Sequence, residues 1–327
     1  MAIFDINAKY QVHVNEFTAF QHSSLFSSIE FFRLHSSSAE DLFFQLVRIS
    51  DQQVIAVIPF YEVEKKIFKA PKKGTYANVD SLIPLSFNVL SEFLQFIDAH
   101  FQSLDAISVF VRLPPSSHDP TKHSYTFNQL TQLGFNLDIL DINFNLAISN
   151  QPYEEIISYS ARKKLHKCES ANFYPQILSD NFFDEAYNVI VENRAKFSQS
   201  VSMNALDLRS MLNLFPQSFH LFGLFEDTSC ELMIASAFCI EVEPHILYIF
   251  YWGDRPGFEE YSSITLLSKF IYDFAKLRSF SLLDAGISTS SGKPNLGLIN
   301  YKKNLGFSAS TKELLVKNYL QKNDSNS

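Results

Sequence analysis

The chain has 327 residues, of which 46% are hydrophobic and 19% are charged. At this length a single hydrophobic core stops growing efficiently, so we expect two domains of similar size. The net charge of -8 at pH 7 excludes a protein whose whole surface grips nucleic acid, and no DNA partner is expected, because neutralising phosphates needs clustered Lys and Arg.

The cysteines, the histidines and the hydropathy of the chain indicate the compartment and the cofactors to expect. The three cysteines are an odd number without metal-ligand spacing, which favours unpaired thiols in a reducing compartment. The nine histidines form no metal-spaced cluster, so no metal cofactor is expected. The first residues hold no apolar segment of signal-peptide length, and no uncharged apolar run reaches the length of about 18 residues that a membrane span needs. We therefore expect a cytoplasmic protein without a membrane span.

In the first half, the pattern predicts a β-hairpin over residues 42–63, with Pro59 breaking its second strand or placing it at a sheet edge. A basic, turn-rich stretch follows at 65–80. It is interpreted either as a solvated connecting loop or as a cationic loop that covers a substrate. The remaining expected elements are a helix over 87–101, a strand over 106–113, a helix over 126–133 and one or two strands within 135–148.

The segment Ser-Asn-Gln-Pro at 149–152 is typical of a boundary, so the expected domains are 1–148 and 149–327. The second half predicts helices over 153–170, 182–197, 205–214, 262–278 and 298–304. A hairpin over 219–241 and strands over 246–252, 280–283 and 314–320 complete it.

The order of elements repeats. In each half a hairpin, a helix, a strand, a short helix and a Leu-Gly-Phe sequence precede a closing strand, and these sequences stand at 133–135 and 305–307. Such self-similarity indicates two copies of one α/β unit, with mixed sheets flanked by helices. Aligning the two Leu-Gly-Phe sequences places Leu130 opposite Lys302, so a cation is found in the second copy only.

The stretch 284–307 is unusual because six of the nine glycines of the chain fall between residues 253 and 306. A strand that ends in Asp284 leads into a Ser/Thr/Gly/Pro loop and then into a short helix with adjacent lysines. A polar loop at the carboxyl end of a strand is where α/β proteins usually bind ligands.

Two segments carry a resemblance to a known family. SYSARKKLHKCESANF (158–173) resembles the basic opening helix of the Fem-type aminoacyltransferases and related acyltransferases. NLGLINYKKNLGF (295–307) resembles the closing "G-L-x-x-F-K-x-x-F-G" signature of that family. The matching positions are Gly297, Leu298, Tyr301, Lys302, Leu305 and Gly306. The resemblance covers about residues 150–310, and Asn172 stands near the place where the family has a glycine that ends the basic helix.

The resemblance implies an α/β (α+β) fold of two tandem GNAT-like units, with the acceptor side in the first and the donor side in the second. It implies transfer of an acyl or aminoacyl group from acyl-CoA or aminoacyl-tRNA to an amine. The acceptor would be a small molecule or a cell-envelope or polysaccharide precursor, and tRNA is left open as a partner.

Two residues are the candidates for catalysis. Lys302 would stabilise negative charge on the carbonyl oxygen or leaving group of the donor, and the alternative is a solubilising surface lysine. Asp284 would orient the attacking amine or accept its proton, and the alternative is a cap on the following loop.

Candidate binding residues form two groups. A donor-binding group would form a cleft wall and a channel from Tyr251, Trp252, Ser290, Ser291, Lys293 and Gly297. An acceptor-binding group of cations, able to hold phosphates by charge-assisted hydrogen bonds, contains Arg162, Lys163, Lys167 and Arg194. The alternatives are a core tryptophan, a connecting loop and a solvated helix end.

The loop at 253–260 lacks the features by which ordinary acetyltransferases bind the pyrophosphate of acetyl-CoA. Its two glycines are separated by Pro256, which lacks an N–H, and its acids Asp254, Glu259 and Glu260 repel phosphate. The donor is therefore left open. The alternative function is a non-catalytic binding protein that retains the GNAT-like fold.

Overall fold

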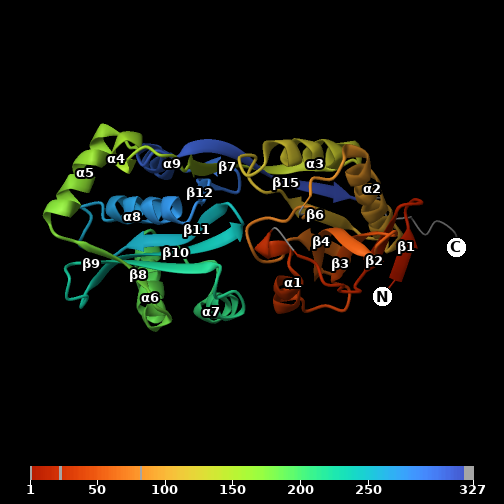
Figure 1. Ribbon diagram of the computed structural model, residues 1–327, viewed down its shortest axis with the longest axis horizontal. Coiled ribbons are helices and arrows are strands. Elements are labelled where there is room, and N and C mark those ends of the chain that lie inside the picture. Colours follow the sequence, from red (N-terminus) through yellow and green to blue (C-terminus); the bar gives the residue numbers. More distant parts are fainter. Residues whose placement is uncertain (1, 22–23, 82, 320–327) are drawn as a thin grey trace. The chain divides into compact units, whose positions relative to one another are not determined.

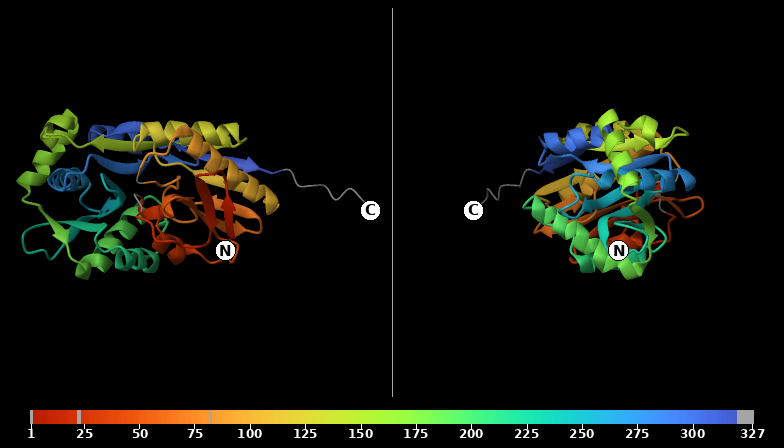
Figure 2. Two further views of the ribbon diagram at one scale, coloured as in Figure 1. Left: turned by 45° about the vertical axis from the view of Figure 1, so that its right-hand side comes forward. Right: turned by 90° about the vertical axis from the view of Figure 1, so that its left-hand side faces the viewer.

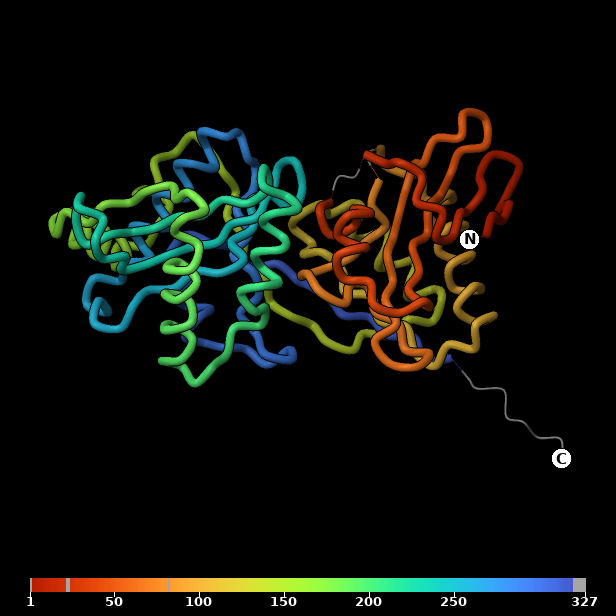
Figure 3. Tube along the Cα trace, turned by 90° about the horizontal axis from the view of Figure 1, so that it is seen from below, coloured from red at the N-terminus to blue at the C-terminus, as the bar shows by residue number. Residues whose placement is uncertain are grey.

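The structure is a computed structural model that describes residues 2–21, 24–81 and 83–319. The chain forms two compact units, whose trace can be followed in Figure 3. Unit 1 comprises Met1–Ile142, Ser291–Lys293 and Ser310–Ser327. Unit 2 comprises Asn143–Ser290 and Pro294–Ala309. The predicted domain limits, 1–148 and 149–327, stay a prediction.

The sheet of unit 1 has the strand order β1-β2-β3-β4-β5-β6-β15. These strands are Ala2–Asp5, Tyr10–Val14, Leu42–Arg48, Gln53–Glu64, Ile67–Ala70, Ser108–Arg112 and Ser308–Asn318. Helices α2 (Phe87–Ser103) and α3 (Pro120–Gln132) cover one face, and α1 (Ile29–His35), preceded by the 3₁₀ turn η1 (Leu25–Ser27), covers the other (Figure 1). The strand predicted over 314–320 is the later part of β15, and residue 320 lies outside the described residues.

Alternation along β3 and β4 builds a core on each face of this sheet. Phe44 and Phe60 pack with Phe101 of α2, whereas Phe43 and Tyr61 pack with Phe32 of α1. Successive strand side chains point to opposite faces, so a strand buried on both sides reads as a continuous apolar run. The abundant phenylalanines of this half therefore fill two layers.

The expectation for Pro59 is wrong, because β4 runs through it and lies between β3 and β5. Phe43, which faces Pro59 in the register, directs its own N–H and C=O toward Asn15, so this pair needs no hydrogen bond between β3 and β4. On the other side of β4, pairing with β5 begins only at Tyr61. The missing N–H of proline thus falls where no ladder bond is required.

The sheet of unit 2 has the strand order β7-β12-β11-β10-β9-β8. These strands are Asn136–Ala147, Leu282–Ile287, Ile246–Asp254, Met233–Glu243, Phe219–Phe225 and Tyr174–Leu178. Strand β7 begins in unit 1, and its residues from Asn143 on belong to unit 2. Helix α8 (Ile264–Leu277) covers one face and α6 (Phe183–Lys196) the other (Figures 1 and 2). The remaining elements are α4 (Tyr153–Ile156), α5 (Tyr159–Ser170), η2 (Asp180–Phe182), α7 (Ala205–Leu214), α9 (Leu296–Asn304) and the short strands β13 (Thr289–Ser290) and β14 (Lys293–Pro294).

The single helix predicted over 153–170 is wrong, because α4 and α5 are separated at Ile157. Ser158 takes an extended conformation, and its side chain accepts a hydrogen bond from the Ala161 N–H at 3.2 Å. A serine that caps a new helix competes with continuation of the old one. At the far end of α5, Asn172 has a φ of 59°, so it adopts the left-handed conformation that its type tolerates.

The two units end matching helices in the same way. Gly134 and Gly306 have φ of 89° and 87°. The next residue donates its N–H five positions back, from Phe135 to Leu130 O at 3.0 Å and from Phe307 to Lys302 O at 3.1 Å. This is the Schellman motif, which needs a residue in the left-handed region after the helix. The predicted repeat therefore has a counterpart in hydrogen bonding.

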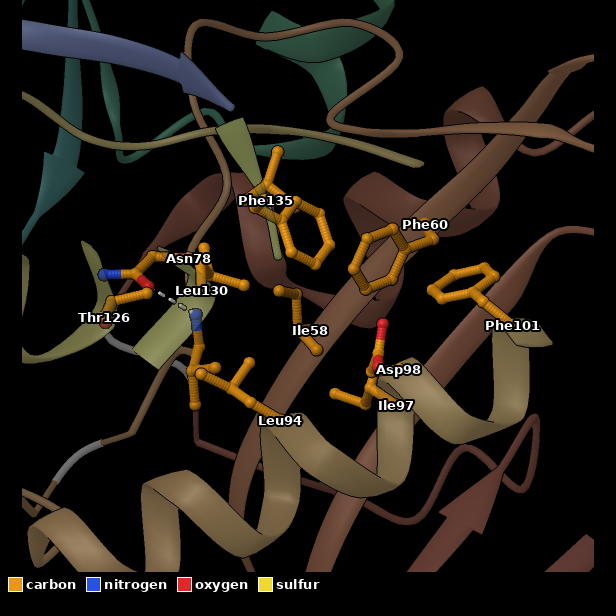
Figure 4. A pocket seen from close by; sticks show the side chains of 12 residues that line it. Ile58, Phe60, Asn78, Leu94, Ile97, Asp98, Phe101, Thr126, Leu130 and Phe135 are labelled. Carbon is orange, nitrogen blue, oxygen red and sulfur yellow. Dashed lines mark hydrogen bonds between the residues drawn. The ribbon is translucent and has the colours of Figure 1, made fainter. Parts of the chain in front are cut away.

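In unit 1, the helix position that matches Lys302 belongs to the core. Leu130 is 3% exposed and faces an internal cavity of about 10 Å³ (Figure 4). Ile58, Phe60, Leu94 and Phe135 also line this cavity. A space of this size is at the lower limit for one water molecule. The site is close-packed and mostly apolar, and its polar lining residues are Asn78, Asp98 and Thr126.

Within the described part of the chain, no helix combines the length and the hydropathy needed to span a bilayer.

Candidate functional site

The candidate site of unit 2 lies where two parallel strands part. Strands β11 and β12 pair from Ile246↔Leu282 to Tyr248↔Asp284, where the register between their described residues ends. Both continue further, β11 to Asp254 and β12 to Ile287. Beyond Tyr248 and Asp284 the two strands no longer pair with each other. The carboxyl ends of strands are the usual ligand side of α/β sheets.

Helix α9 directs Lys302 inward beside this point. Asn295 caps the helix by accepting the Leu298 N–H at 3.1 Å. Lys302 is the buried residue of this helix, with 2% exposure. Its Nζ donates to Gly286 O and to Ile287 O, each at 2.9 Å. The predicted alternative of a surface lysine is therefore wrong, because the ammonium is held by the backbone of β12.

The electrostatic setting of Lys302 is unfavourable for a cation. Burial lowers the pKa of Lys302 to about 7, the charge of Asp284 raises this pKa, and the charge of Arg194 lowers it. The Nζ also lies 5.7 Å from the centroid of the Phe144 ring. Near neutral pH both protonation states of this lysine are therefore populated, unlike those of a solvated lysine.

Asp284 is buried and shares Gly286 with Lys302. Its Oδ1 accepts the Gly286 N–H at 2.7 Å and the Asn143 Nδ2 at 2.8 Å. Gly286 has a φ of +73°, and a Cβ there would lie 3.2 Å from the Tyr248 Oη. Asp284 thus binds the N–H of Gly286, while Lys302 binds its carbonyl. Only glycine fits this conformation without strain.

Two buried polar atoms near this centre were missed by the sequence analysis. Asn143 Oδ1 and Ser288 Oγ have no hydrogen-bond partner among the described residues, and both residues are 0% exposed. Unsatisfied buried polar atoms are uncommon in folded proteins. Ser288 lies in the Ser/Thr loop that was singled out, whereas Asn143 is 141 residues from Asp284 and carried no local signal.

The basic run of α5 faces an acidic loop of its own unit. Lys167 Nζ pairs with Glu260 at 2.5 Å, and Lys164 Nζ donates to Glu260 O at 2.7 Å. Lys196 pairs with Glu259 at 2.7 Å, in the loop between β11 and α8. Glu259 and Glu260 are thus paired with cations rather than free to repel a ligand, whereas Asp254 accepts a hydrogen bond from Asn193.

The other predicted acceptor residues differ in their surroundings. Arg162 is half-buried, and its Nε has no partner among the described residues. Lys163 is exposed and lies 4.6 Å from the centroid of the Tyr159 ring. Arg194 is half-buried in the last turn of α6, and its charge acts on Lys302. Of these residues, Arg194 thus acts on Lys302 through its charge, whereas α5 pairs with the acidic loop.

The predicted donor residues fall into two sets. Tyr251 Oη bonds to Ser202 Oγ at 2.6 Å and accepts the Met203 N–H at 3.0 Å. Trp252 is half-buried, and its ring lies 6.1 Å from Phe307 in an edge-on arrangement. Both belong to β11 of unit 2. The Tyr251 hydroxyl and the Trp252 indole thus make contacts within this unit.

The loop after β12 is a hairpin of β13 and β14. Ser291 and Gly292 form its turn with φ of 47° and 74°, which is typical of a two-residue turn with both central residues left-handed. Ser290, Ser291 and Lys293 are exposed, and Ser291 and Lys293 belong to unit 1. Gly297 is exposed at the start of α9, where a Cβ would make only an ordinary contact of 3.5 Å with Asn295.

Among residues 2–21, 24–81 and 83–319, no group of three His, Cys, Asp or Glu side chains is arranged to hold a metal ion. What the centre can do follows from its donors. A lysine ammonium has three N–H groups. Two are bound to carbonyl oxygens, and the third has no hydrogen-bond partner among the described residues.

Comparison with known proteins gives a match at the level of structure. No protein-family model matches the chain, and no curated protein matches it either. The solved structure of FemX has a TM-score of 0.66 at 10% identity, over 91% of this chain and 94% of that one. The chain has a Fem-like tandem GNAT fold.

Two further structures agree. L-PGS from Bacillus licheniformis has a TM-score of 0.55 at 11% identity, over 84% of this chain and 83% of that one. A conserved protein of unknown function from Bacteroides thetaiotaomicron has a TM-score of 0.56 at 9% identity, over 89% of each chain. At these identities the likeness shows the fold. The predicted fold class, two tandem GNAT-like units, is confirmed.

Proposed function

We propose that the chain is an acyltransferase that moves an acyl or aminoacyl group from a thioester such as acyl-CoA, or from an aminoacyl-tRNA, to an amine. The observation that carries the proposal is Lys302, a buried ammonium fixed to β12 where the pairing of β11 and β12 ends. Burying a lysine costs stability even where hydrogen bonds offset part of that cost, so we attribute its position to function rather than to stability.

The chemistry follows from the third N–H of Lys302. The amine nitrogen attacks the carbonyl carbon of the donor, and the new C–N bond forms as negative charge develops on the carbonyl oxygen. An ammonium already held by two backbone carbonyls stabilises that charge without reorganising, which is the most effective form of electrostatic catalysis. The C–S or C–O bond to the leaving group then breaks. The amine proton leaves with solvent or with a neighbouring base.

Asp284 is the candidate for positioning the amine. Its carboxylate is fixed by Gly286 and Asn143, and its charge favours the protonated form of Lys302. With a pKa near 7, Lys302 is about half protonated at neutral pH. Because stabilising the oxyanion requires the charged form, activity should fall as the pH rises through this value.

The wider assignment extends the resemblance to the Fem-type family. Unit 2 would take the donor, in the cytoplasm. The acceptor was expected in unit 1, but its four candidate residues all lie in unit 2, which would therefore bind at least part of the acceptor as well. The acceptor would be a small molecule or a cell-envelope or polysaccharide precursor with a free amine. Tyr251, Trp252, Ser290, Ser291, Lys293 and Gly297 remain donor candidates, and Arg162, Lys163, Lys167 and Arg194 remain acceptor candidates.

A second candidate is a non-catalytic binding protein. The loop between β11 and α8 favours it, because Glu259 and Glu260 occupy the place where a phosphate-binding loop would present glycines. The ion pairs with Lys167 and Lys196 lower the repulsion but supply no backbone N–H groups to a pyrophosphate.

A donor screen separates the two candidates. The chain would be titrated with acyl-CoAs and with charged and uncharged tRNA, while thermal unfolding is followed. A donor at 100 times its dissociation constant stabilises the folded state by about 2.7 kcal/mol. A shift with one donor class, followed by transfer to an amine, supports the acyltransferase. The absence of any shift across the donors favours the binding protein.

A further inference from the structure

The basic stretch 65–80 forms part of a pocket in unit 1 that the proposed function does not use. The cavity has a volume of about 200 Å³ and lies at the carboxyl end of the parallel pair β5 and β6. Its charged lining residues are Lys69, Lys72 and Arg112. Pockets for drug-sized ligands have volumes of about 300–1,000 Å³. This pocket therefore suits a small group rather than a whole cofactor.

The backbone around the pocket is held by strand pairing and by close packing. Strands β5 and β6 are in register up to Ala70↔Val111, and the lining continues into Pro71 and Gly74. Gly74 has a φ of +92°, and a Cβ there would lie 2.8 Å from the Phe26 ring. The loop after β5 is thus packed against Phe26 at a position that admits only glycine.

The three cations of the pocket are little neutralised by the partners that the structure records. Arg112 Nη1 pairs with the buried Asp141 at 2.7 Å, and among the described residues its Nε and Nη2 make no further hydrogen bond. Lys72 Nζ donates to the neutral Ser37 Oγ at 2.5 Å. Lys69 Nζ lies 5.2 Å from the Phe110 ring centroid and has no carboxylate partner within the described chain. The charged residues that line the pocket are thus all cations, in a protein whose net charge is -8.

We propose that this pocket binds a phosphate group of a small soluble ligand, such as a phosphomonoester or a diphosphate. A guanidinium with two donor nitrogens available matches the geometry of phosphate oxygens, and lysines add point charges. Asp141 is already bound by Arg112 and by the Gly292 N–H at 3.3 Å, so it holds Arg112 in place and competes little for the ligand. The site lies wholly in unit 1, and it is independent of acyl transfer.

The test is calorimetric titration of the whole chain with inorganic pyrophosphate, without any acyl donor. The wild type should bind pyrophosphate saturably at one site. Lys69→Gln and Lys72→Gln should each weaken binding about tenfold or more, because a hydrogen bond to a charged group contributes roughly 1.5 to 3 kcal/mol. Lys122→Gln makes the same charge change on α3 of unit 1, outside the pocket, and should bind as the wild type does.

A charge-retaining variant and a titration with vesicles of anionic phospholipid complete the experiment. Lys72→Arg should retain binding, which separates loss of charge from loss of folding. Absence of saturable binding by the wild type, or equal affinities in the wild type and both glutamine variants, would overturn the proposal. So would binding only to vesicles of anionic phospholipid, weakened by Lys69→Gln and Lys72→Gln, because the phosphate would then belong to a membrane surface.

Discussion

Units 1 and 2 end equivalent helices with the same hydrogen bonds, yet they place opposite side chains at the equivalent position. In unit 1, Leu130 closes an apolar core around a cavity of about 10 Å³. In unit 2, Lys302 is equally buried and binds the carbonyls of Gly286 and Ile287. Both helices end with the same backbone hydrogen bonds. The two units therefore differ in the side chain at one helix position and in the groups that surround it.

The comparison indicates where this duplicated scaffold can carry chemistry. A leucine at this position contributes to stability through apolar burial, whereas a lysine must be compensated by hydrogen bonds and by Asp284. The buried residue at this position stabilises unit 1, whereas its counterpart lowers the stability of unit 2. Such a trade-off is typical of functional positions in folded proteins.

The largest effect is expected when the chemistry of unit 2 is placed in unit 1. Leu130→Lys would bury a cation beside a carboxylate, Asp98, that is already bound to Lys317 and Tyr319, which should lower the free energy of unfolding by about 3 to 5 kcal/mol. Leu130→Met keeps volume and polarity and should lower it by less than about 1.5 kcal/mol. Urea denaturation of both variants measures the difference. Equal stabilities would contradict the view that unit 1 is apolar at this point.

The two glycines after these helices should differ in their tolerance of alanine. Both have positive φ, so each alanine variant should lose about 1 to 2 kcal/mol through strain. A Cβ at Gly306 would lie 2.6 Å from Ile156 Cγ2, whereas the nearest atom at Gly134 is Lys317 Cε at 3.9 Å. Gly306→Ala should therefore lose about 1 kcal/mol more, through overpacking. A Gly134→Ala variant that is the less stable of the two in urea would refute this reading.

Stability should depend on pH through Lys302 and not through its neighbour. The folded-state pKa is about 7, and the unfolded value is near 10.4. Between these values the unfolded chain binds more protons, so stability rises with pH. The rise should approach about 1.4 kcal/mol per pH unit in the wild type. It should vanish in Lys302→Met and persist in Lys303→Met, in which an exposed lysine is replaced.

Urea titrations of these three proteins between pH 6 and 10 measure the slope, since the other titrating groups are common to all. A wild-type slope equal to that of Lys302→Met would show that the lysine keeps an ordinary pKa.

A smaller shift is expected from Asp284→Asn. The asparagine keeps an oxygen acceptor for Gly286 and Asn143 but removes the negative charge that raises the pKa of Lys302. The pH at which stability begins to rise should therefore move lower than in the wild type. An unchanged or higher onset would remove Asp284 from the electrostatics of Lys302.

Local patterns predicted much of the fold. Helix α7 was expected over 205–214 and is found at those bounds, because Asn204 caps it and apolar residues recur at helical spacing. Helix α3 begins six residues before its expected start at 126. Asp119 accepts the Lys122 N–H, and Pro120 occupies the first turn. An Asp-Pro pair of this kind predicts the start of a helix at residue 120.

The site was less predictable because it depends on distant contacts. Lys302 was singled out from the repeat and the resemblance, but its burial follows from the carbonyls of a bulged strand end at Gly286 and Ile287. The link between Asn143 and Asp284 joins two strands that are neighbours only in the folded sheet. No local spacing reports such a pairing.

The most direct test of the central claim is the turnover of Lys302→Met, with the donor that the screen identifies and an amine acceptor. We expect turnover to fall by on the order of a hundredfold relative to the wild type, as when one oxyanion donor is removed. Lys303→Met, the matched change one residue later, should retain wild-type turnover. If a folded Lys302→Met turned over as fast as the wild type, Lys302 would not stabilise the transition state, and the account of unit 2 would be wrong.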